Sequence, residues 1–153
     1  MKIDSFYTFN EYMKENKLTI SEEDYLEMIY RLCLDKKYTR VNKLAQAINV
    51  KPPSVSKMLK KLTKKNLIQH VEYGIIQLTA QGKKIGKSLL ERHLIIENFL
   101  KLLGIKDNLL QETEKIEHTA NTETVLKINL LLDFFDNNAE IKTKLQTWMN
   151  DNR

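Results

Sequence analysis

The amino-acid sequence predicts a mainly α-helical fold in which a winged helix-turn-helix domain is followed by a second helical domain. Glycine and proline are scarce, with four and two among 153 residues, which favours helices over a turn-rich β fold. Two short apolar helix patterns precede a pair of strand-like runs, the order expected of a winged helix-turn-helix. Charge is also divided into blocks: residues 36–71 hold ten basic and no acidic side chains, whereas residues 1–35 hold four basic and eight acidic ones. This division predicts one surface that binds a polyanion and another that binds a positively charged partner.

The composition is that of an ordinary soluble globular protein. The chain is 42% hydrophobic and 29% charged, and it has no apolar run near the roughly 18 residues that suggest a membrane span. Its first residues lack the basic start and apolar stretch of a signal peptide, so we expect a cytoplasmic protein with no membrane partner. The single cysteine, Cys33, excludes an internal disulfide. It continues an apolar helical series with Leu26 and Ile29, which predicts a core position.

Residues 1–20 form an N-terminal extension to which the sequence assigns no role. The first strong helix pattern begins near Ser21, a residue type that caps helices well. Asp24 and Glu27 follow three residues apart, so both lie on one side of this helix, opposite its apolar stripe. The helix dipole alone favours an acid in the first turn, and this explains Asp24 better than Glu27.

The basic block contains the pattern of a helix-turn-helix. Two short helices are predicted on either side of Asn49, one of the few non-glycine residues that tolerate a left-handed turn. Pro52 and Pro53 can open the second helix, because its first turn needs no amide donors. A lysine run alone is usually a solvated helix face, but the absence of acids from residues 36–71 favours DNA phosphates as its partner. The residues predicted to contact DNA, most of them on this second or recognition helix, are Arg40, Lys51, Pro53, Ser54, Ser56, Lys57, Lys60 and Lys61.

A β-hairpin wing and a long helix are predicted after the recognition helix. Strand-like runs over residues 67–71 and 75–79 flank a turn at Gly74. A long amphipathic helix is then predicted over residues 80–103, and Gly104 ends it. Three lysines at the start of this helix extend the basic surface: Lys83, Lys84 and Lys87.

Glu114, Glu117 and His118 lie at helical spacing in the second half of the chain. Residues three and four apart share one face of a helix, so the two carboxylates and the imidazole can converge on one cation. This oxygen-rich set suits a divalent ion such as manganese. The long helix adds His93 and, four residues on, Glu97. Exposed glutamates are usually only solvated, and a lone histidine on such a helix is more often structural, so the metal interpretation needs support from elsewhere in the chain.

The order of these motifs resembles the diphtheria-toxin-repressor family, and within it the branch of manganese transport regulators. The resemblance covers residues 21–137 and rests on Asp24-x-x-Glu27, the winged helix-turn-helix, Gly82-Lys83-Lys84-Ile85-Gly86, Arg92-His93 and Glu114-x-x-Glu117-His118. It implies that Mn²⁺, two ions per subunit, is bound by Asp24, Glu27, His93, Glu114, Glu117 and His118, with Glu97 as a weaker, ancillary ligand. The iron-responding branch has methionine and cysteine at the positions of Asp24 and Glu114. Carboxylates there favour the harder Mn²⁺, with other divalent ions as competitors.

The resemblance also implies a function. A homodimer would bind double-stranded operator DNA, with metal as the corepressor, and would repress metal-uptake genes. Residues 21–84 are then the DNA-binding domain, and residues 85–153 the helical linker, dimerisation and metal-binding domain. Within the latter, residues 121–135 repeat apolar positions suited to packing inside the chain or against a partner helix. We expect no third, SH3-like domain, no enzymatic activity and no organic small-molecule substrate.

Three other functions stay open at the level of the sequence. The chain can be an iron-responsive regulator of the same family. It can be a winged-helix regulator of an organic ligand, in which the acidic residues only decorate the surface. It can also be a binuclear metallohydrolase, since two carboxylate-bridged metals can activate water, although no further general-base or oxyanion pattern stands out.

Overall fold

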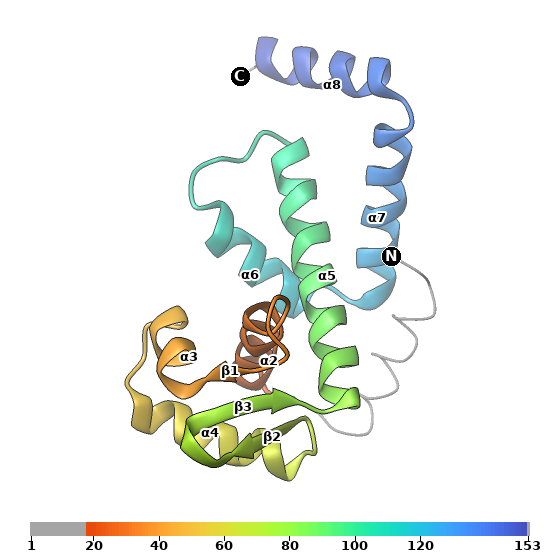
Figure 1. Ribbon diagram of the computed structural model, residues 1–153. Helices are drawn as coiled ribbons and strands as arrows, with labels where there is room; N and C mark the ends of the chain where they lie inside the picture. The colour runs from red at the N-terminus through yellow and green to blue at the C-terminus, as the bar shows by residue number, and fades with distance from the viewer. Residues whose placement is uncertain (1–17, 153) are drawn as a thin grey trace. The chain divides into compact units, whose positions relative to one another are not determined.

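The structure, a computed structural model, describes residues 18–152, and most of them are helical (Figure 1). This part of the chain forms two compact units, residues 18–90 and residues 91–152. The first unit contains α2 (Ile20–Leu32), β1 (Thr39–Arg40), α3 (Val41–Ala47), α4 (Pro52–Lys64), β2 (Ile68–Val71), β3 (Ile75–Leu78) and the first half of α5 (Ala80–Leu102). The second contains the rest of α5 with α6 (Leu109–Thr119), α7 (Thr122–Asp136) and α8 (Ala139–Asp151). The predicted fold class is confirmed. The predicted extension, residues 1–20, lies almost entirely outside the described residues.

Helix α2 is capped by Thr19, and not by Ser21 as predicted. The Thr19 hydroxyl accepts a hydrogen bond from the backbone N–H of Glu22, and the Glu22 carboxylate accepts one from the N–H of Thr19 at 2.8 Å. This reciprocal capping box satisfies two backbone donors. Ser21 with Asp24 has the same spacing in the sequence, but a glutamate three residues after the cap completes the box, and Thr19 has one. Leu26 and Ile29, which share the buried face of the helix with Glu22, are fully buried.

The helix-turn-helix is formed by α3 and α4, as predicted. Asn49 adopts the left-handed conformation between them, with φ at 52°. Pro52 and Pro53 occupy the first two positions of α4, where no amide donor is lost. The core of this unit is made by fully buried side chains from its helices, its strands and the turn after α4, among them Leu26, Ile29, Leu44, Val55, Leu59, Leu62, Leu67 and Ile76.

The wing is part of a three-stranded antiparallel sheet with the order β1-β3-β2. The predicted hairpin is present, with Ile68 opposite Leu78 in the β2–β3 register. Strand β1 was not predicted, because two residues are too few to show an alternating pattern; it places Thr39 opposite Ile76. The turn also differs from the prediction, since Tyr73 as well as Gly74 has a positive φ, 62° and 70°.

Close packing of α5 on the first unit depends on its glycines. A Cβ atom on Gly82 would lie 1.8 Å from the backbone oxygen of Leu67, and one on Gly86 would lie 2.7 Å from the Cβ of Tyr30. Both positions therefore require glycine for the helix to approach. The helix ends as predicted at Gly104, which has φ at 77° and donates its N–H to the carbonyl of Lys101.

Cys33 caps the C-terminus of α2 and is half-buried against the core. The prediction of a core position is therefore confirmed only in part. Burial raises the pKa of the Cys33 thiol, and the positive charge of Lys83 opposes this rise in pKa. The thiol is thus kept in its unreactive, protonated form.

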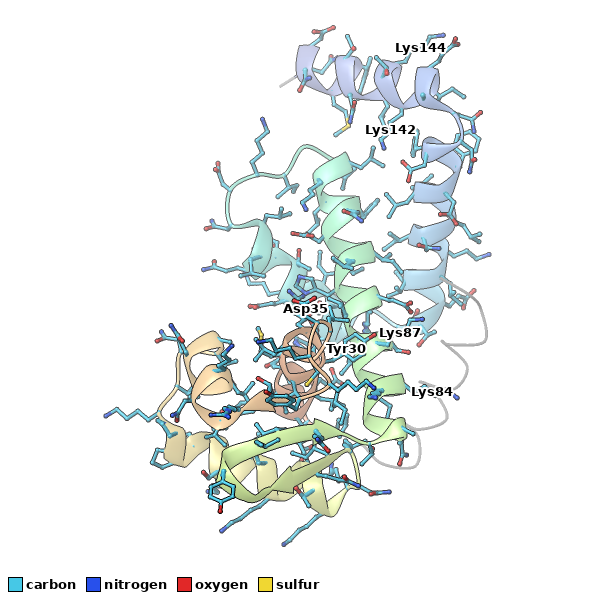
Figure 2. All side chains as sticks on the ribbon, viewed as in Figure 1. Tyr30, Asp35, Lys84, Lys87, Lys142 and Lys144 are labelled. Atoms are coloured by element: carbon cyan, nitrogen blue, oxygen red, sulfur yellow. The ribbon has the colours of Figure 1, made fainter. Side chains whose placement is uncertain are left out.

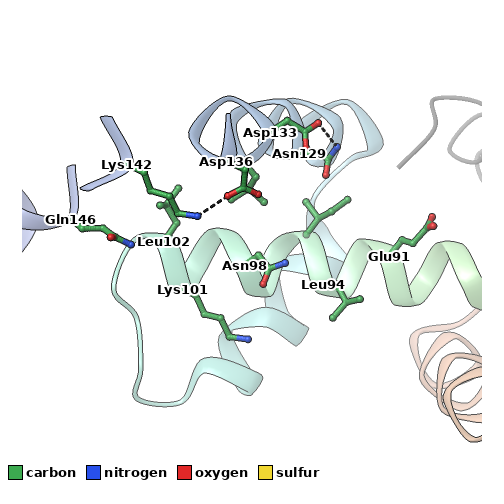
Figure 3. A pocket seen from close by; sticks show the side chains of 12 residues that line it. Glu91, Leu94, Asn98, Lys101, Leu102, Asn129, Asp133, Asp136, Lys142 and Gln146 are labelled. Carbon is green, nitrogen blue, oxygen red and sulfur yellow. Dashed lines mark hydrogen bonds and ion pairs between the residues drawn. The ribbon is translucent and has the colours of Figure 1, made fainter. Parts of the chain in front are cut away.

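The second unit packs around Ile95, Ile96 and Leu100 of α5 and Val125 of α7, all buried. Helix α8 was not predicted, although its half-buried positions include Leu145 and Met149 at helical spacing. Between α5, α7 and α8 lies a cavity of about 590 Å³, which Figure 3 shows from close by with the ion pair of Lys142 and Asp136 at its edge. Several large apolar side chains stay exposed on α7 and α8: Leu130, Leu131, Phe134, Ile141 and Trp148. None of the described helices combines the length and apolar character that a bilayer span requires.

Candidate functional site

His93 and Glu117 meet at a buried point of the second unit. His93 comes from α5 and Glu117 from α6, and each is only 6% exposed. The Nδ1 atom of His93 lies 2.8 Å from Oε2 of Glu117, yet this oxygen accepts no hydrogen bond among the described residues. A buried carboxylate oxygen without a hydrogen bond is costly. Donor atoms that share one divalent ion at roughly 2.1 Å each approach one another to such a separation, so the pair fits a metal ion.

The other oxygen of Glu117 faces the second histidine of the predicted site. Nε2 of His118 lies 3.7 Å from Oε1 of Glu117, and the His118 side chain is 12% exposed. Glu117 therefore stands between two imidazoles, one from each helix. Glu114 lies one turn earlier on α6 and is exposed. The structure thus brings together His93, Glu117 and His118, whereas Glu114 stays on the outer surface of the helix.

Arg92 holds the end of α6 beside His93. Its Nη2 atom donates a hydrogen bond to the backbone carbonyl of Ala120, the residue that caps the C-terminus of α6. Because Arg92 precedes His93 in α5, this bond fixes the two helices at the level of the histidine. The sequence indicated Arg92 only as part of the Arg92-His93 motif and did not reveal this role.

Glu97 lies one turn beyond His93 on α5 and is half-buried. Its carboxylate forms an ion pair with Lys101, at 3.0 Å between Oε2 and Nζ. An exposed i, i+4 pair of this kind stabilises a helix by only about 0.3–0.5 kcal/mol. Glu97 therefore has Lys101 as a partner on its own helix, and it stays the ancillary candidate ligand.

In the first unit, α2 carries the two remaining acidic candidates. Asp24 is exposed and Glu27 is half-buried. The guanidinium of Arg31 contacts one oxygen of Glu27 twice: Nη2 lies 2.6 Å and Nε 2.9 Å from Oε1. The sequence prediction did not include Arg31, although its position four residues after Glu27 was the available signal.

Helix α4 presents a cationic surface on the first unit. Its apolar face, with Val55, Leu59 and Leu62, is buried, so the remaining positions point outward. Seven of the eight residues predicted to contact DNA are exposed: Arg40, Lys51, Pro53, Ser54, Lys57, Lys60 and Lys61. Ser56 is half-buried, and its hydroxyl donates to the backbone carbonyl of Pro52. Figure 2 labels two further lysines, Lys84 and Lys87, which are exposed on the first turns of α5.

The turn of the wing presents an aromatic side chain that the sequence prediction passed over. Tyr73 is 91% exposed and its backbone is left-handed. A bulky residue in this conformation is uncommon. A tyrosine combines an apolar ring with a hydroxyl that can bond to phosphate, so Tyr73 adds to the candidate nucleic-acid surface.

The arrangement can perform two kinds of chemistry. The histidines and the carboxylate of α5 and α6 supply nitrogen and oxygen donors of the kind that bind borderline and hard divalent ions. The exposed lysines of α4 can neutralise phosphates, while the first turns of a helix can enter a major groove. Both surfaces belong to the same chain.

Comparison with known proteins places these features in a family. Residues 17–75 match the iron dependent repressor N-terminal DNA binding domain, and residues 79–146 match the iron dependent repressor metal binding and dimerisation domain. A transcriptional regulator named MntR from Shouchella clausii is 41% identical over 121 residues, which cover 78% of this chain and 85% of that protein. MntR of Bacillus subtilis is 38% identical over 130 residues, covering 84% and 92%.

Solved structures agree with the sequence comparison. The manganese regulator SloR is 31% identical with a TM-score of 0.65, and IdeR of T. acidophilum is 28% identical with the same TM-score. These matches cover 74% and 77% of this chain but only 54% and 55% of the solved chains, so the chain spans about half of their length. The chain therefore belongs to the iron dependent repressor family, the diphtheria-toxin-repressor family that its motif order predicts.

Proposed function

We propose that this protein is a manganese-responsive transcriptional regulator, which binds operator DNA as a metal-activated homodimer and represses metal-uptake genes. The observation that carries the proposal is the buried pair of His93 and Glu117, whose facing atoms lie 2.8 Å apart without a hydrogen bond to the Glu117 oxygen. It occurs in a chain whose other unit has an exposed cationic recognition helix. The names of the relatives, MntR and the manganese regulator SloR, support manganese.

The proposed ligands come from three helices. His93, Glu117 and His118 form the part supported by the distances within the second unit. Asp24 and Glu27 of α2, and Glu114 of α6, are included because of the family resemblance and because carboxylates suit Mn²⁺. Two ions per subunit would be held by these six side chains. Glu97 is the ancillary candidate.

Manganese is preferred to iron because the set contains four carboxylates, two imidazoles and no sulfur. Soft thiolate and thioether ligands favour other metals, whereas carboxylate oxygens suit harder ions. The iron-responsive alternative predicts the opposite order of activation by the two metals. A titration that compares Mn²⁺, Fe²⁺ and Zn²⁺ therefore separates the two functions.

The proposed coupling of metal binding to DNA binding relies on ligands from both units. When bound, the divalent ion supplies the positive charge that lets clustered carboxylates share one site. Asp24 and Glu27 belong to the helix that packs beneath the helix-turn-helix, through Leu26 and Ile29. His93, Glu117 and His118 belong to the metal-binding and dimerisation domain. Shared ligation would favour one spacing of the two recognition helices in a dimer, and thus shift the population toward DNA binding.

We further propose a regulatory and not a catalytic role in the cytoplasm. The relatives are named as transcriptional regulators. A protein that binds operator DNA must be in the compartment that holds this DNA. Operator half-sites about one helical turn apart, roughly 10 bp, are expected for such a dimer.

The proposal is tested by DNA binding with and without metal. DNA duplexes with a randomised central sequence are first selected for binding to the protein in the presence of Mn²⁺. The selected duplex is then titrated with protein, in Mn²⁺ or in chelator, and binding is followed by fluorescence anisotropy. We expect an inverted-repeat sequence and affinity at least tenfold tighter with Mn²⁺. Equal specific affinity in chelator would refute metal activation.

A variant links this result to the site. Glu117→Gln keeps the shape of the side chain and removes its charge, so it should abolish the effect of Mn²⁺ on DNA affinity. The matched control is Glu112→Gln on the same helix, because the Glu112 carboxylate pairs with Lys115 and is not a proposed ligand. Unchanged Mn²⁺ activation in Glu117→Gln would contradict the assignment.

A further inference from the structure

Arg31 makes two close contacts with Glu27, a proposed ligand in the first unit. Its Nη2 and Nε atoms lie 2.6 Å and 2.9 Å from the same oxygen, Oε1 of Glu27. The side chains are 33% and 13% exposed, for Arg31 and Glu27 respectively. A pair that is partly withdrawn from water in this way is less screened than a fully exposed pair.

A guanidinium at this position opposes a metal ion on the same carboxylate. Arg31 is charged at every relevant pH, so its charge is a fixed repulsion toward a divalent cation nearby. Its two N–H groups also donate into lone pairs of Oε1, which a metal needs. Metal binding through Oε1 of Glu27 would therefore weaken or share the contact with Arg31, and binding through Oε2 would still meet the positive charge of Arg31.

The contact with Arg31 involves Glu27, one of the two proposed ligands on α2. Four residues after Glu27 stands Arg31, whereas four residues after Asp24 stands Met28, which has no charge. The comparable pair of Glu97 with Lys101 is looser, because the lysine is 51% exposed and makes one contact at 3.0 Å. Arg31 therefore acts on Glu27, through its two contacts with Oε1.

We propose that Arg31 is a built-in counter-ion of Glu27 that weakens manganese binding and so raises the concentration of Mn²⁺ needed for activation. This inference rests on the proposed function, since it takes Glu27 as a metal ligand. Arg31 acts through Glu27 and is thus a positioning residue, with no direct contact to the ion required. The chain would sense a higher range of metal concentration than it would with an uncharged residue at this position.

The test measures Mn²⁺ binding by isothermal titration calorimetry on the full chain, separately from DNA binding. Arg31→Met removes the charge and keeps a good helix former. We expect its Mn²⁺ affinity to rise about tenfold, while Arg31→Lys stays within about threefold of the wild type. Lys115→Met is the matched control, because it removes one positive charge from an intrahelical pair with Glu112, a residue that is not a proposed ligand; it should change the affinity less than twofold.

A double-mutant cycle shows whether the effect passes through Glu27. In a Glu27→Gln background, Arg31→Met should no longer tighten Mn²⁺ binding, which a purely structural role for Arg31 would not predict. Melting curves in chelator verify that the variants fold, as expected from the buried Leu26 and Ile29 of the same helix. Unchanged or weaker Mn²⁺ affinity in Arg31→Met would overturn the counter-ion role while leaving the proposed function intact. Absence of saturable Mn²⁺ binding in the wild type would overturn both.

Discussion

Lys65 and Glu22 join the end of the recognition helix to the start of α2. The Nζ atom of Lys65, the residue that caps the C-terminus of α4, lies 2.9 Å from Oε2 of Glu22. The same oxygen accepts the N–H of Thr19 in the capping box. One buried carboxylate thus fixes a helix terminus and ties it to the helix that we propose reads DNA.

Removing Lys65 should destabilise the first unit. Lys65→Met leaves the buried Glu22 carboxylate without its cation, at a cost of about 1–3 kcal/mol in the free energy of unfolding. Lys64→Met is the control, since Lys64 is exposed and should change stability by no more than about 0.5 kcal/mol. Urea denaturation at pH 7 measures both. Equal effects of the two substitutions would count against a structural role for the pair.

The same pair predicts a dependence of stability on pH. Burial alone would raise the pKa of Glu22, but the hydrogen bonds from Lys65 and Thr19 and the charge of Lys65 hold this pKa below its ordinary value of 4.5. A carboxyl whose pKa is lower in the folded state stabilises the fold above its unfolded pKa, and this stabilisation is lost as the pH falls through the folded pKa. The stability difference between wild type and Glu22→Gln should therefore be constant above about pH 5.5 and shrink below pH 4.5. A stability difference that grows as the pH falls would contradict a Glu22 pKa that is lowered in the folded state.

Two lysines of α4 should affect DNA binding in different ways. Lys57 lies in the middle of the exposed face of α4, and Lys64 lies in its last turn. Lys57→Ala should weaken binding to the selected operator and relax selectivity. Lys64→Ala should mainly reduce the slope of log affinity against log salt, by about one. Anisotropy titrations on operator and random duplex distinguish these results, and equal losses on both duplexes for both variants would contradict the recognition-helix assignment.

The sequence predicted most of the fold but less of the site. The helix-turn-helix, the wing and the end of α5 were predicted correctly because Asn49, the two prolines and Gly104 each have a strong local preference. Strand β1 could not be predicted, since its partner β3 lies more than thirty residues away and two residues show no pattern. Helix α8 was passed over because its apolar residues form only a weak stripe, and none of its side chains is fully buried.

At the site, helical spacing placed Glu117 beside His118 but could not show how deeply each side chain is buried. Whether a side chain is buried depends on the neighbouring helix, and the pairing of His93 with Glu117 joins residues 24 positions apart in the chain. The roles of Arg92 and Arg31 were missed for a different reason. An arginine on a helix is ordinarily an exposed surface residue, and only the structure shows which groups its side chain contacts.

Gly82 should be essential for folding of the first unit. A Cβ at this position would overlap the carbonyl oxygen of Leu67 at 1.8 Å, and a backbone atom cannot move aside as a flexible side chain can. Gly82→Ala should therefore lower the free energy of unfolding by about 3 kcal/mol or more. Lys84→Ala, at an exposed position two residues later, should have little effect. Thermal denaturation followed by circular dichroism compares them, and similar melting temperatures would contradict the close approach of α5.

The most direct test of the account is whether α2 and α6 bind the same manganese ions. Equilibrium dialysis of Mn²⁺ against the full chain should give saturable binding near two ions per subunit in the wild type. Asp24→Asn in the first unit and His118→Ala in the second should each weaken it at least tenfold, and Mn²⁺ should then fail to tighten DNA binding in both variants. Manganese binding that is lost in His118→Ala but unchanged in Asp24→Asn and Glu27→Gln would contradict a site shared between the DNA-binding and metal-binding units.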